Sequence, residues 1–433
     1  MAPTTNTATN GPVDPEHVAG AGHRTFLRTN PRTDRFQALD FHHVELWCAD
    51  AASSASRFSS ALGVPLAARS DLSTGNTAHA SHLLRSGSLS FLFTAPHAER
   101  CSGDHATIPS FSPQDASRFA ADHGCPVVRA VALRVPDAAE AFRTSVSGGA
   151  RPAFAPVDLG LGFGFAEIEL YGDVVLRFVS CPEDNDEDTF LPGFQRIVGR
   201  SGAAPDYGLR RIDHVVGCLP ELAPVAKYMA GFTGFHEFVE YTAEEVGTAE
   251  SGLNILIIAN NTETVLFNLA EPVHGTKRRS QVQTFLDHHG GPGVQHIALA
   301  SDDVLATLRE VRAAGGLEFL EPRPPSYYDG VRRRVGDVLS EAQIMGCQEL
   351  GVLVDRDDQG VLLQIFTKPV GDRQTLYLEM IQRIGCMEKD EETGRAYQRG
   401  ACGGFGKGNF RELFRAVEDY EKALEAKLPA AAN

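Results

Sequence analysis

The sequence predicts an α+β protein composed of two open, barrel-like β domains with helices on the outside. Its 433 residues are enough for two or three ordinary domains. An internal repeat contains, in each copy, a short strand followed by a helix that ends near a glycine. Other segments alternate between apolar and polar residues or are continuously apolar, which is typical of strands.

The repeat pairs two stretches from each half of the chain. Residues 40–65 (DFHHVELWCADAASSASRFSSALGVP) match residues 212–237 (IDHVVGCLPELAPVAKYMAGFTGFHE). Farther along, residues 130–149 match residues 296–316, again with a strand, a helix that begins after Asp and a glycine stop. Apolar patterns predict further strands at 88–94, 165–179, 254–259, 264–269 and 362–367. The chain therefore consists of four units, each with a strand, a helix and more strands.

The segment between the two halves has the composition of a linker. Residues 181–207 contain an acidic run at 183–188, a Pro-Gly turn and the sequence SGAAPDY. We therefore predict a disordered tail at 1–35, a first domain at 36–180, a linker at 181–207 and a second domain at 208–427. The second domain ends in a helix at 409–427, and residues 428–433 form a short tail.

Composition excludes several classes of protein. A formal net charge of −16 argues against a nucleic-acid surface, which requires a basic stripe. The longest apolar runs are far too short to span a membrane. Eight cysteines without any CxxC spacing predict reduced thiols rather than a disulfide framework. The first Lys or Arg after Met1 is Arg24, and no apolar stretch precedes it, so we predict a cytoplasmic protein.

The duplication separates candidate functional residues from core residues, because a site retained in only one copy is not explained by the shared fold. His43 and His214 correspond in the two copies. Opposite His296, however, stands Ala130, and opposite Glu379 stands Arg177. Only the second half therefore combines two imidazoles with one carboxylate.

Two histidines and one carboxylate leave several metal coordination positions open, as iron(II) oxygenases require for a chelating substrate and O₂. Zinc is more often closed by four ligands or bound through cysteine. Taken singly, a histidine on a strand is more often structural, and a glutamate on a strand often faces solvent. Glu379 is a stronger candidate because it lies between Leu378 and Met380 in an apolar strand, where it needs a partner.

The chain resembles a known family of enzymes. The segments RRIDHVVG, GGPGVQHIALAS, YLEMIQRIGC and CGGFGKGNFRELF are similar to plant 4-hydroxyphenylpyruvate dioxygenases, and most similar to those of grasses. The resemblance extends over residues 36–427 and includes FHHVELWCAD and LYGDVVLRFVS in the first half. It implies the vicinal-oxygen-chelate fold, built from paired units of the kind that the repeat predicts.

The resemblance also implies roles for individual residues. His214, His296 and Glu379 match the iron ligands. The residues that match pocket amides, ring-stacking aromatics and the helix that closes the site are Gln281, Gln295, Gln364, Phe366, Phe405, Asn409, Phe410 and Leu413. Apolar residues at helical spacing from Phe410 onward agree with such a helix, although simple core packing also explains them.

The implied reaction uses iron(II) and O₂ to convert 4-hydroxyphenylpyruvate, a small aromatic 2-oxo acid, to homogentisate and CO₂. The steps are oxidative decarboxylation, ring hydroxylation and side-chain migration. The substrate carries its own 2-oxo acid, so no second oxo acid is needed. The family also implies a homodimer.

Four pocket positions depart from the family pattern. Ile255 replaces a serine, Asn268 a proline, Ala270 an asparagine and Tyr377 a phenylalanine. Loss of the serine and asparagine removes hydrogen-bond partners of the glutamines, and one such contact can change substrate discrimination by orders of magnitude. The first alternative is therefore benzylic hydroxylation of an aryl-pyruvate to a mandelate.

Three other readings have less support in the sequence. A weakly active homologue that still binds iron is the second alternative. A glyoxalase or an extradiol-cleaving enzyme of the same fold is disfavoured by the full-length resemblance. The segment GGFGKGN is not a phosphate-binding loop, because Ala401 stands where the first glycine is required and Gly408 stands where Ser or Thr is required.

Overall fold

The computed structural model describes residues 29–97, 105–182, 189–197, 206–320, 323–389, 394 and 396–426. The expectations for residues 1–28, for the acidic run at 183–188 and for the tail at 428–433 lie outside these described residues.

Each half of the chain contains two copies of a β-α-β-β-β unit, as the repeat predicts. The first unit consists of β1 (Asp40–Trp47), α1 (Ala51–Leu62), β2 (Leu66–Ser70), β3 (His79–Ser86) and β4 (Leu89–Pro96). The second consists of β5 (Val127–Arg134), α3 (Ala138–Ser147), β6 (Pro152–Gly160), β7 (Phe163–Tyr171) and β8 (Val174–Ser180).

The second half repeats this order. The third unit consists of β10 (Leu209–Cys218), α4 (Leu222–Thr233), β11 (His236–Tyr241), β12 (Leu253–Ala259) and β13 (Leu266–Pro272). The fourth consists of β14 (Gly293–Ser301), α7 (Val304–Ala314), β15 (Leu353–Arg356), β16 (Gly360–Phe366) and β17 (Tyr377–Gly385).

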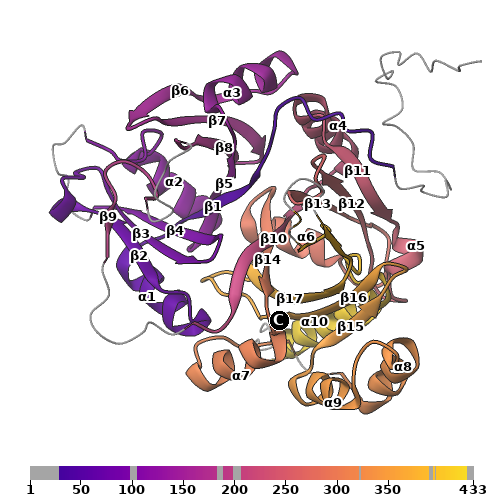
Figure 1. The fold of residues 1–433 in the computed structure, drawn as a ribbon. Helices are drawn as coiled ribbons and strands as arrows, with labels where there is room; N and C mark the ends of the chain where they lie inside the picture. Colours follow the sequence, from indigo (N-terminus) through magenta and orange to yellow (C-terminus); the bar gives the residue numbers. More distant parts are fainter. Residues whose placement is uncertain are drawn as a thin grey trace, which may run out of the picture.

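Further elements connect or extend the units. The helical ones are α2 (Pro113–His123), α5 (Ala243–Val246), α6 (Gln281–His289), α8 (Pro325–Val335), α9 (Glu341–Leu350) and α10 (Phe410–Glu425), with short 3₁₀ turns η2 (Leu72–Thr74) and η3 (Lys407–Asn409). The additional strands are β9 (Gln195–Arg196), β18 (Met387–Lys389) and β19 (Ala396–Gln398). Helices α8 and α9 were not predicted; they lie outside the C-terminal sheet, where α9 packs against α7 and α8 packs against α9 (Figure 1).

Local sequence explains where the repeated helices begin and end. Asp50 precedes α1, and its side chain accepts a hydrogen bond from the Ser53 N–H; Asp303 does the same before α7 for Leu305. α1 ends at Gly63, whose φ of 63° lies in the left-handed region that glycine adopts without a steric cost. Asp137 caps α3 in the same way, whereas Glu221 before α4 makes no side-chain cap bond, so the signal is present in three of the four units.

The strands form one large mixed sheet in each half. Their order is β6-β7-β8-β5-β1-β4-β3-β2-β9 in the first sheet and β11-β12-β13-β10-β14-β17-β16-β15 in the second. In both sheets the first strands of two units pair antiparallel at the centre, β1 with β5 and β10 with β14. Figure 1 shows the two sheets as separate curved layers, the first in indigo to magenta and the second in pink to yellow.

One predicted strand was wrong in its extent. We expected residues 165–179 to form a single strand, but a turn separates β7 from β8. Gly172 lies in this turn with a φ of 54°, and a Cβ at this position would overlap the carbonyl oxygen of Pro292. Continuous apolar composition does not reveal such a turn, because both strands are buried.

The hydrophobic core continues from one half into the other. A single cluster of buried side chains contains residues of both sheets, and Phe41 contacts Phe267 edge-to-face with ring centroids 5.7 Å apart. Separate clusters fill the inside of each sheet. The two halves are therefore packed against each other through side chains that exclude water.

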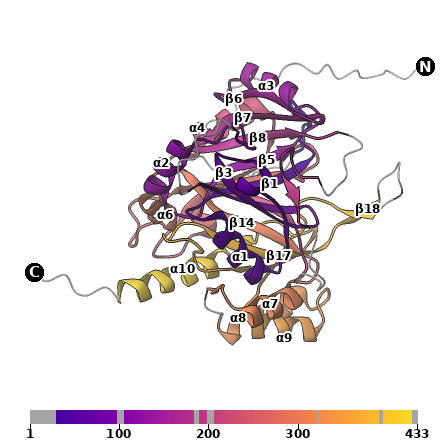
Figure 2. The ribbon, with the colours of Figure 1, turned by 90° about the vertical axis from the view of Figure 1, so that its left-hand side faces the viewer.

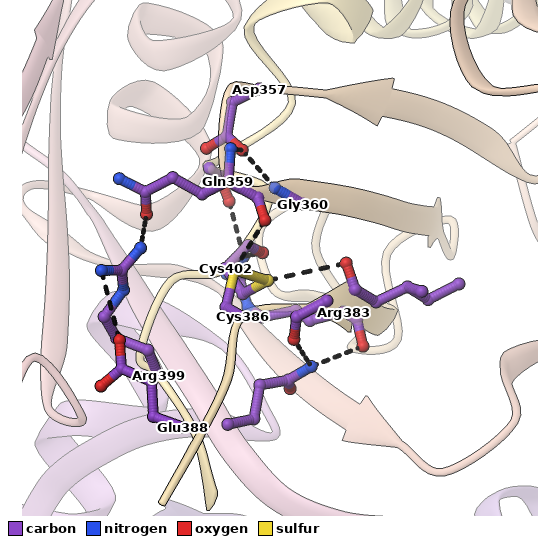
Figure 3. The surroundings of a disulfide bond; sticks show 12 residues. Asp357, Gln359, Gly360, Arg383, Cys386, Glu388, Arg399 and Cys402 are labelled. Atoms are coloured by element: carbon purple, nitrogen blue, oxygen red, sulfur yellow. Dashed lines mark hydrogen bonds and ion pairs between the residues drawn. A yellow bond between two sulfur atoms is a disulfide. The ribbon is translucent and has the colours of Figure 1, made fainter. Parts of the chain in front are cut away.

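The prediction that the cysteines are reduced thiols was wrong for one pair. Cys386, directly after β17, forms a disulfide with Cys402, and their Cα atoms lie 5.8 Å apart (Figure 3). The bond closes the segment that holds β18 and β19, which projects from the body of the protein in Figure 2. The two cysteines are 16 residues apart and have no motif spacing, so only the fold shows that they meet.

No helix in the described part of the chain is long and apolar enough to cross a membrane.

Candidate active site

Three predicted metal ligands meet inside the C-terminal sheet. His214 on β10, His296 on β14 and Glu379 on β17 come from three adjacent strands. One ligand atom of each lies within 4.8 Å of the others. The Nε2 atoms of His214 and His296 lie 3.1 Å and 3.5 Å from Glu379 Oε2. Among the residues that the structure describes, this is the one group of three or more such side chains close enough to hold a metal ion.

Burial and mutual charge set the protonation of the three ligands. Burial alone would raise the pKa of Glu379, but the charge and hydrogen bond of His214, together with those of His296, lower it to about 2. Burial also opposes the charged form of His214, yet the carboxylates of Glu379 and Asp213 raise its pKa. At His296 burial prevails, and the pKa is lowered. The site thus offers an ionised carboxylate beside imidazoles.

His214 is oriented by the residue before it. The pairing of β10 with β14 passes from Ile212 to His214 and skips Asp213, a β-bulge that breaks the usual alternation of side chains. Asp213 Oδ1 lies 2.9 Å from His214 Nδ1, and Arg383 binds both oxygens of the same carboxylate at 2.7 and 3.0 Å. A carboxylate can only accept, so the Nδ1 proton is directed to Asp213 and Nε2 is turned toward Glu379, where a metal ion would take the place of a proton on Nε2.

His296 has a matching arrangement with an amide. The same pair of strands skips Gln295, and Gln295 Oε1 lies 3.2 Å from His296 Nδ1. The hydroxyl of Tyr377 donates to the same Oε1 at 2.9 Å. The Tyr377 ring also stacks on His296, with centroids 4.7 Å apart and planes 18° apart. Both histidines therefore present Nε2 to the centre of the site.

A small cavity opens onto the triad. Most of the lining beyond the ligands is apolar, and its neutral polar side chains are Asn268 and Gln364. The lining residues are His214, Val216, Ile255, Asn268, His296, Gln364, Phe366, Glu379, Phe405, Gly406, Phe410 and Leu413. Of the predicted pocket residues, the structure thus brings Gln364, both aromatic residues, Phe410 and Leu413 to the triad.

Other predicted pocket residues do not line this cavity. Gln281 lies at the start of α6. Gln295 and Tyr377 lie behind His296 and contact each other. Asn409 accepts a hydrogen bond from the Tyr327 hydroxyl at 2.7 Å. Among the divergent positions, Ala270 pairs with Ile255 on the neighbouring strand and is buried in the adjoining apolar cluster.

The cavity is covered by the segment that leads into α10. Gly406 has a φ of 74°, a conformation that favours glycine, and a Cβ at this position would have to displace the Gln364 amide. Arg383 holds the preceding loop, because its Nη1 donates to the carbonyl oxygens of Cys402 and Gly404 at 2.7 and 2.6 Å. The Arg383 guanidinium therefore binds both Asp213, which orients His214, and the loop that covers the cavity.

Sequence reasoning missed the side chains that support the ligands. Asp213 and Arg383 are buried partners 170 residues apart, and Val216 and Gly406 complete the lining. One signal was present, because each histidine of the triad is preceded by a residue whose side chain can accept a hydrogen bond. Arg383 gave no comparable signal in the sequence.

The N-terminal sheet has an arginine where the second half has its carboxylate ligand. Arg177 reaches His43 Nε2 at 2.9 Å and forms ion pairs with Glu45 and Glu167 at 2.5 and 2.7 Å. All four side chains are at most 2% exposed. Burial and the neighbouring Arg177 keep His43 neutral by lowering its pKa. Arg177 is paired with Ala132 on the neighbouring strand as Glu379 is paired with Ala298, so the two residues hold equivalent positions in their sheets.

Comparisons with known proteins agree with this geometry. Residues 211–365 match the Glyoxalase/Bleomycin resistance protein/Dioxygenase superfamily. A 4-hydroxyphenylpyruvate dioxygenase of Hordeum vulgare is 70% identical over 434 residues, covering 99% of this chain and 98% of that protein. The chain belongs to the 4-hydroxyphenylpyruvate dioxygenase family. The same name is carried by a protein of Arabidopsis thaliana that is 56% identical and covers 94% of this chain and 93% of its own.

Solved structures agree as well. A triple mutant of 4-hydroxymandelate synthase from Streptomyces coelicolor superposes with a TM-score of 0.70 at 26% identity and covers 89% of this chain and 99% of its own. The predicted fold, the resemblance to the plant family and the dioxygenase class are thereby confirmed. Membership and the buried triad together indicate a metal site.

Proposed function

We propose that this chain converts 4-hydroxyphenylpyruvate and O₂ to homogentisate and CO₂ with iron(II) held by His214, His296 and Glu379. The observation that carries the proposal is the buried triad at the base of a largely apolar cavity, in a chain 70% identical to a protein of that name. The substrate class is a small aromatic 2-oxo acid.

The donor set fits a divalent iron ion. Both Nδ1 atoms already have acceptors, so two Nε2 lone pairs and one ionised carboxylate converge on one point. Cysteine, which would favour zinc or a cluster, is absent from the cavity lining. When bound, iron(II) would supply the redox chemistry with O₂ and a Lewis-acidic centre for the 2-oxo acid.

The protein side chains supply orientation and exclusion of water. The rings of Phe405 and His214, and those of Phe366 and His296, are in T-shaped contact, with centroids 5.3 and 5.9 Å apart. We infer that the substrate ring packs between Phe405 and Phe366. Phe410 and Leu413 close the cavity from the side of α10 and keep water from the reacting atoms.

Asn268 is proposed to bind the polar end of the substrate ring. Its side chain is 3% exposed, lines the cavity and has an Oδ1 without a hydrogen-bond partner among the described residues. In the substrate anion the carboxylate and keto oxygens only accept hydrogen bonds, so the phenol is the one group able to donate to this oxygen. A buried unpaired acceptor costs about 1–3 kcal/mol, and the phenol would remove that cost.

A second candidate function is benzylic hydroxylation of the same 2-oxo acid to 4-hydroxymandelate. It is favoured by the similarity to the Streptomyces coelicolor synthase and by Ile255 and Asn268 in the cavity lining. Both reactions use the same ligands and the same substrate, and the shape of the cavity separates them. The homodimer and the cytoplasmic location remain parts of the proposal, tested by light scattering and by cell fractionation.

Product analysis decides between the candidates. The purified protein is reconstituted with iron(II) and offered 4-hydroxyphenylpyruvate and phenylpyruvate in air, while O₂ uptake is recorded. The two products are isomers, so chromatography against both standards must accompany mass spectrometry. Homogentisate supports the proposal, 4-hydroxymandelate supports the second candidate, and O₂ uptake at background level identifies a homologue that does not turn over.

A variant tests the role of Asn268 separately. Asn268→Leu replaces the amide by an apolar side chain of the same branched shape. The expected result is a loss of about ten- to a hundredfold in kcat/KM for 4-hydroxyphenylpyruvate with a smaller change for phenylpyruvate. An equal loss for both substrates would show that Asn268 does not recognise the phenol.

A further inference from the structure

Tyr377 touches one metal ligand through its ring and the support of that ligand through its hydroxyl. Tyr377 and His296 are directly paired neighbours on β17 and β14. The ring stacks on the imidazole, and the hydroxyl donates to Gln295 Oε1 at 2.9 Å. Tyr377 stands where the family pattern has phenylalanine, which would keep the stack but could not donate a hydrogen bond.

The orientation of the Gln295 side chain decides which group it presents to His296, whereas the orientation of the Asp213 side chain does not matter for His214. A carboxylate presents an acceptor to the histidine in either orientation, whereas an amide presents either its oxygen or its NH₂ group. With the oxygen toward His296, the proton resides on Nδ1 and the Nε2 lone pair is available for a metal. With the NH₂ group toward His296, Nδ1 becomes the acceptor and Nε2 carries the proton, which prevents coordination.

The Tyr377 hydroxyl favours the first of these orientations. In the structure, Gln295 Oε1 accepts from Tyr377 at 2.9 Å and lies 3.2 Å from His296 Nδ1. A phenol is a better donor than acceptor, so the orientation that presents the amide oxygen to both neighbours has the better pair of hydrogen bonds. Gln295 is 7% exposed, and solvent therefore competes little for its amide.

We propose that Tyr377 is a positioning residue for the metal site, which orients the Gln295 amide and thereby selects the His296 tautomer that binds iron. The inference rests on the proposed metal site. It explains why Tyr377 contacts Gln295, the partner of His296. The partner of His214 is the Asp213 carboxylate, which accepts in either orientation and needs no such contact. Gln295 is then occupied in supporting a ligand, consistent with its position outside the cavity lining.

Metal affinity measured without turnover tests the proposal. The wild-type protein and the variants Tyr377→Phe, Gln295→Leu and the double variant are titrated anaerobically with cobalt(II), whose absorption in the visible range reports coordination. Tyr377→Phe removes one hydroxyl and retains the ring. Tyr328→Phe is the matched control, because its buried hydroxyl also donates one hydrogen bond, to Val352 O at 3.2 Å, in a helix away from the site.

The expected result is a cobalt(II) affinity about tenfold weaker in both single variants, the effect typical of losing a partner of a ligand. The double variant should be no weaker than Gln295→Leu, because Tyr377 acts through Gln295. Tyr328→Phe should match the wild type. Unchanged affinity in Tyr377→Phe, or additive losses in the double variant, would overturn the proposal.

A spectroscopic measurement distinguishes positioning from packing. In the cobalt(II) protein, the Nδ1 protons of the two histidine ligands give paramagnetically shifted signals that exchange with solvent. Tyr377→Phe should accelerate exchange at one of these signals and leave the other unchanged. Equal behaviour of both signals would contradict the proposal, whereas no cobalt(II) binding by the wild type would contradict the proposed metal site itself.

Discussion

Asp213 and Gln295 occupy equivalent β-bulges, and each presents a side-chain oxygen to Nδ1 of the histidine that follows it, at 2.9 and 3.2 Å. The strand pairing skips each of them, which breaks the period-two alternation and lets two consecutive side chains act together. The two supports differ in charge, one a carboxylate neutralised by arginine and the other an amide. His214 and His296 are therefore equivalent in geometry but not in electrostatics.

Replacing the charged support should weaken the metal site. In Asp213→Asn an amide meets both His214 and Arg383, so His214 loses its fixed tautomer and Arg383 its carboxylate. We expect metal affinity to fall about 10- to 100-fold, measured by competition with a chelator. The control is Asp337→Asn, which breaks an exposed pair with Arg356 and should leave the affinity unchanged. Equal affinity in Asp213→Asn and the wild type would contradict this assignment.

The buried arginine of the N-terminal sheet should be essential for stability. Arg177→Met leaves Glu45 and Glu167 buried without their cation, and we expect the free energy of unfolding to drop by about 3–5 kcal/mol. Arg151→Met removes a largely exposed pair with Glu169 and should cost at most about 1 kcal/mol. Urea unfolding of both variants compares them. Similar midpoints would show that the buried pairs do not stabilise the sheet.

Two buried histidines and one half-buried histidine should make the fold sensitive to acid. Burial, the largest cause in each case, lowers the pKa of His42 to about 3 and of His79 and His289 to about 4. The unfolded chain binds these protons near pH 6.5, so the free energy of unfolding should fall as the pH decreases from about 6.5 to 4. His123, Arg373 and Asp173 act on His289 through their charges.

One variant isolates the contribution of His289. His289→Phe preserves the ring between Phe285 and His123 but removes the titrating group. The loss of stability between pH 7.5 and pH 4 should then be smaller than in the wild type by about 3 kcal/mol. Unfolding measured across that range checks this, and identical slopes would show that His289 is protonated in the folded protein.

The disulfide should restrain the segment that carries β18 and β19. Non-reduced peptide mapping should recover Cys386 and Cys402 in one cross-linked fragment, and reduction should accelerate tryptic cleavage after Lys389 and Arg399. Closing a loop of this length is worth about 3 kcal/mol relative to the unfolded chain. The double variant Cys386→Ser/Cys402→Ser should be cleaved quickly with or without reductant. Separate fragments from the non-reduced protein would refute the pairing.

A methyl group at Gly406 should displace the segment that covers the cavity and leads into α10. Gly406→Ala places a Cβ against the Gln364 amide, and we expect KM for the 2-oxo acid to rise about tenfold. Gly275→Ala is a matched control, because its φ of 81° resembles the 74° of Gly406 but no atom lies near its Cβ. In both variants the positive φ destabilises the folded protein by about 1–2 kcal/mol, because alanine is strained there. Equal kinetics in the two would mean that the contact with Gln364 is unimportant.

Local patterns explain how much of the fold could be predicted. The helix caps at Asp50 and Asp303 and the glycine after α1 are encoded in a few adjacent residues, so these β-α steps were predictable. The turn at Gly172 was missed because the buried strands on both sides of it have the same apolar composition. Helices α8 and α9 were missed because the unit between α7 and β15 has no counterpart in the other repeats.

The candidate metal ligands could be chosen from the sequence because the two duplicated halves of the chain can be compared with each other. His214, His296 and Glu379 appear in one copy, and Ala130 and Arg177 replace two of them in the other. The ion pair of Asp213 with Arg383 and the contact of Tyr377 with Gln295 could not be chosen in this way. Each joins residues that lie 170 or 82 positions apart and depends on strand register.

The sequence by itself determined the duplicated units, the half that contains the triad and the family of the chain, because these depend on local patterns and residue identity. The tertiary structure alone decided which polar group faces which: Gln295 turned to His296 and Tyr377, and Asn268 left open to the cavity. For Gln295 the physical reason is the β-bulge. A one-residue shift in pairing reverses the side on which a residue lies, and no local pattern reports such a shift.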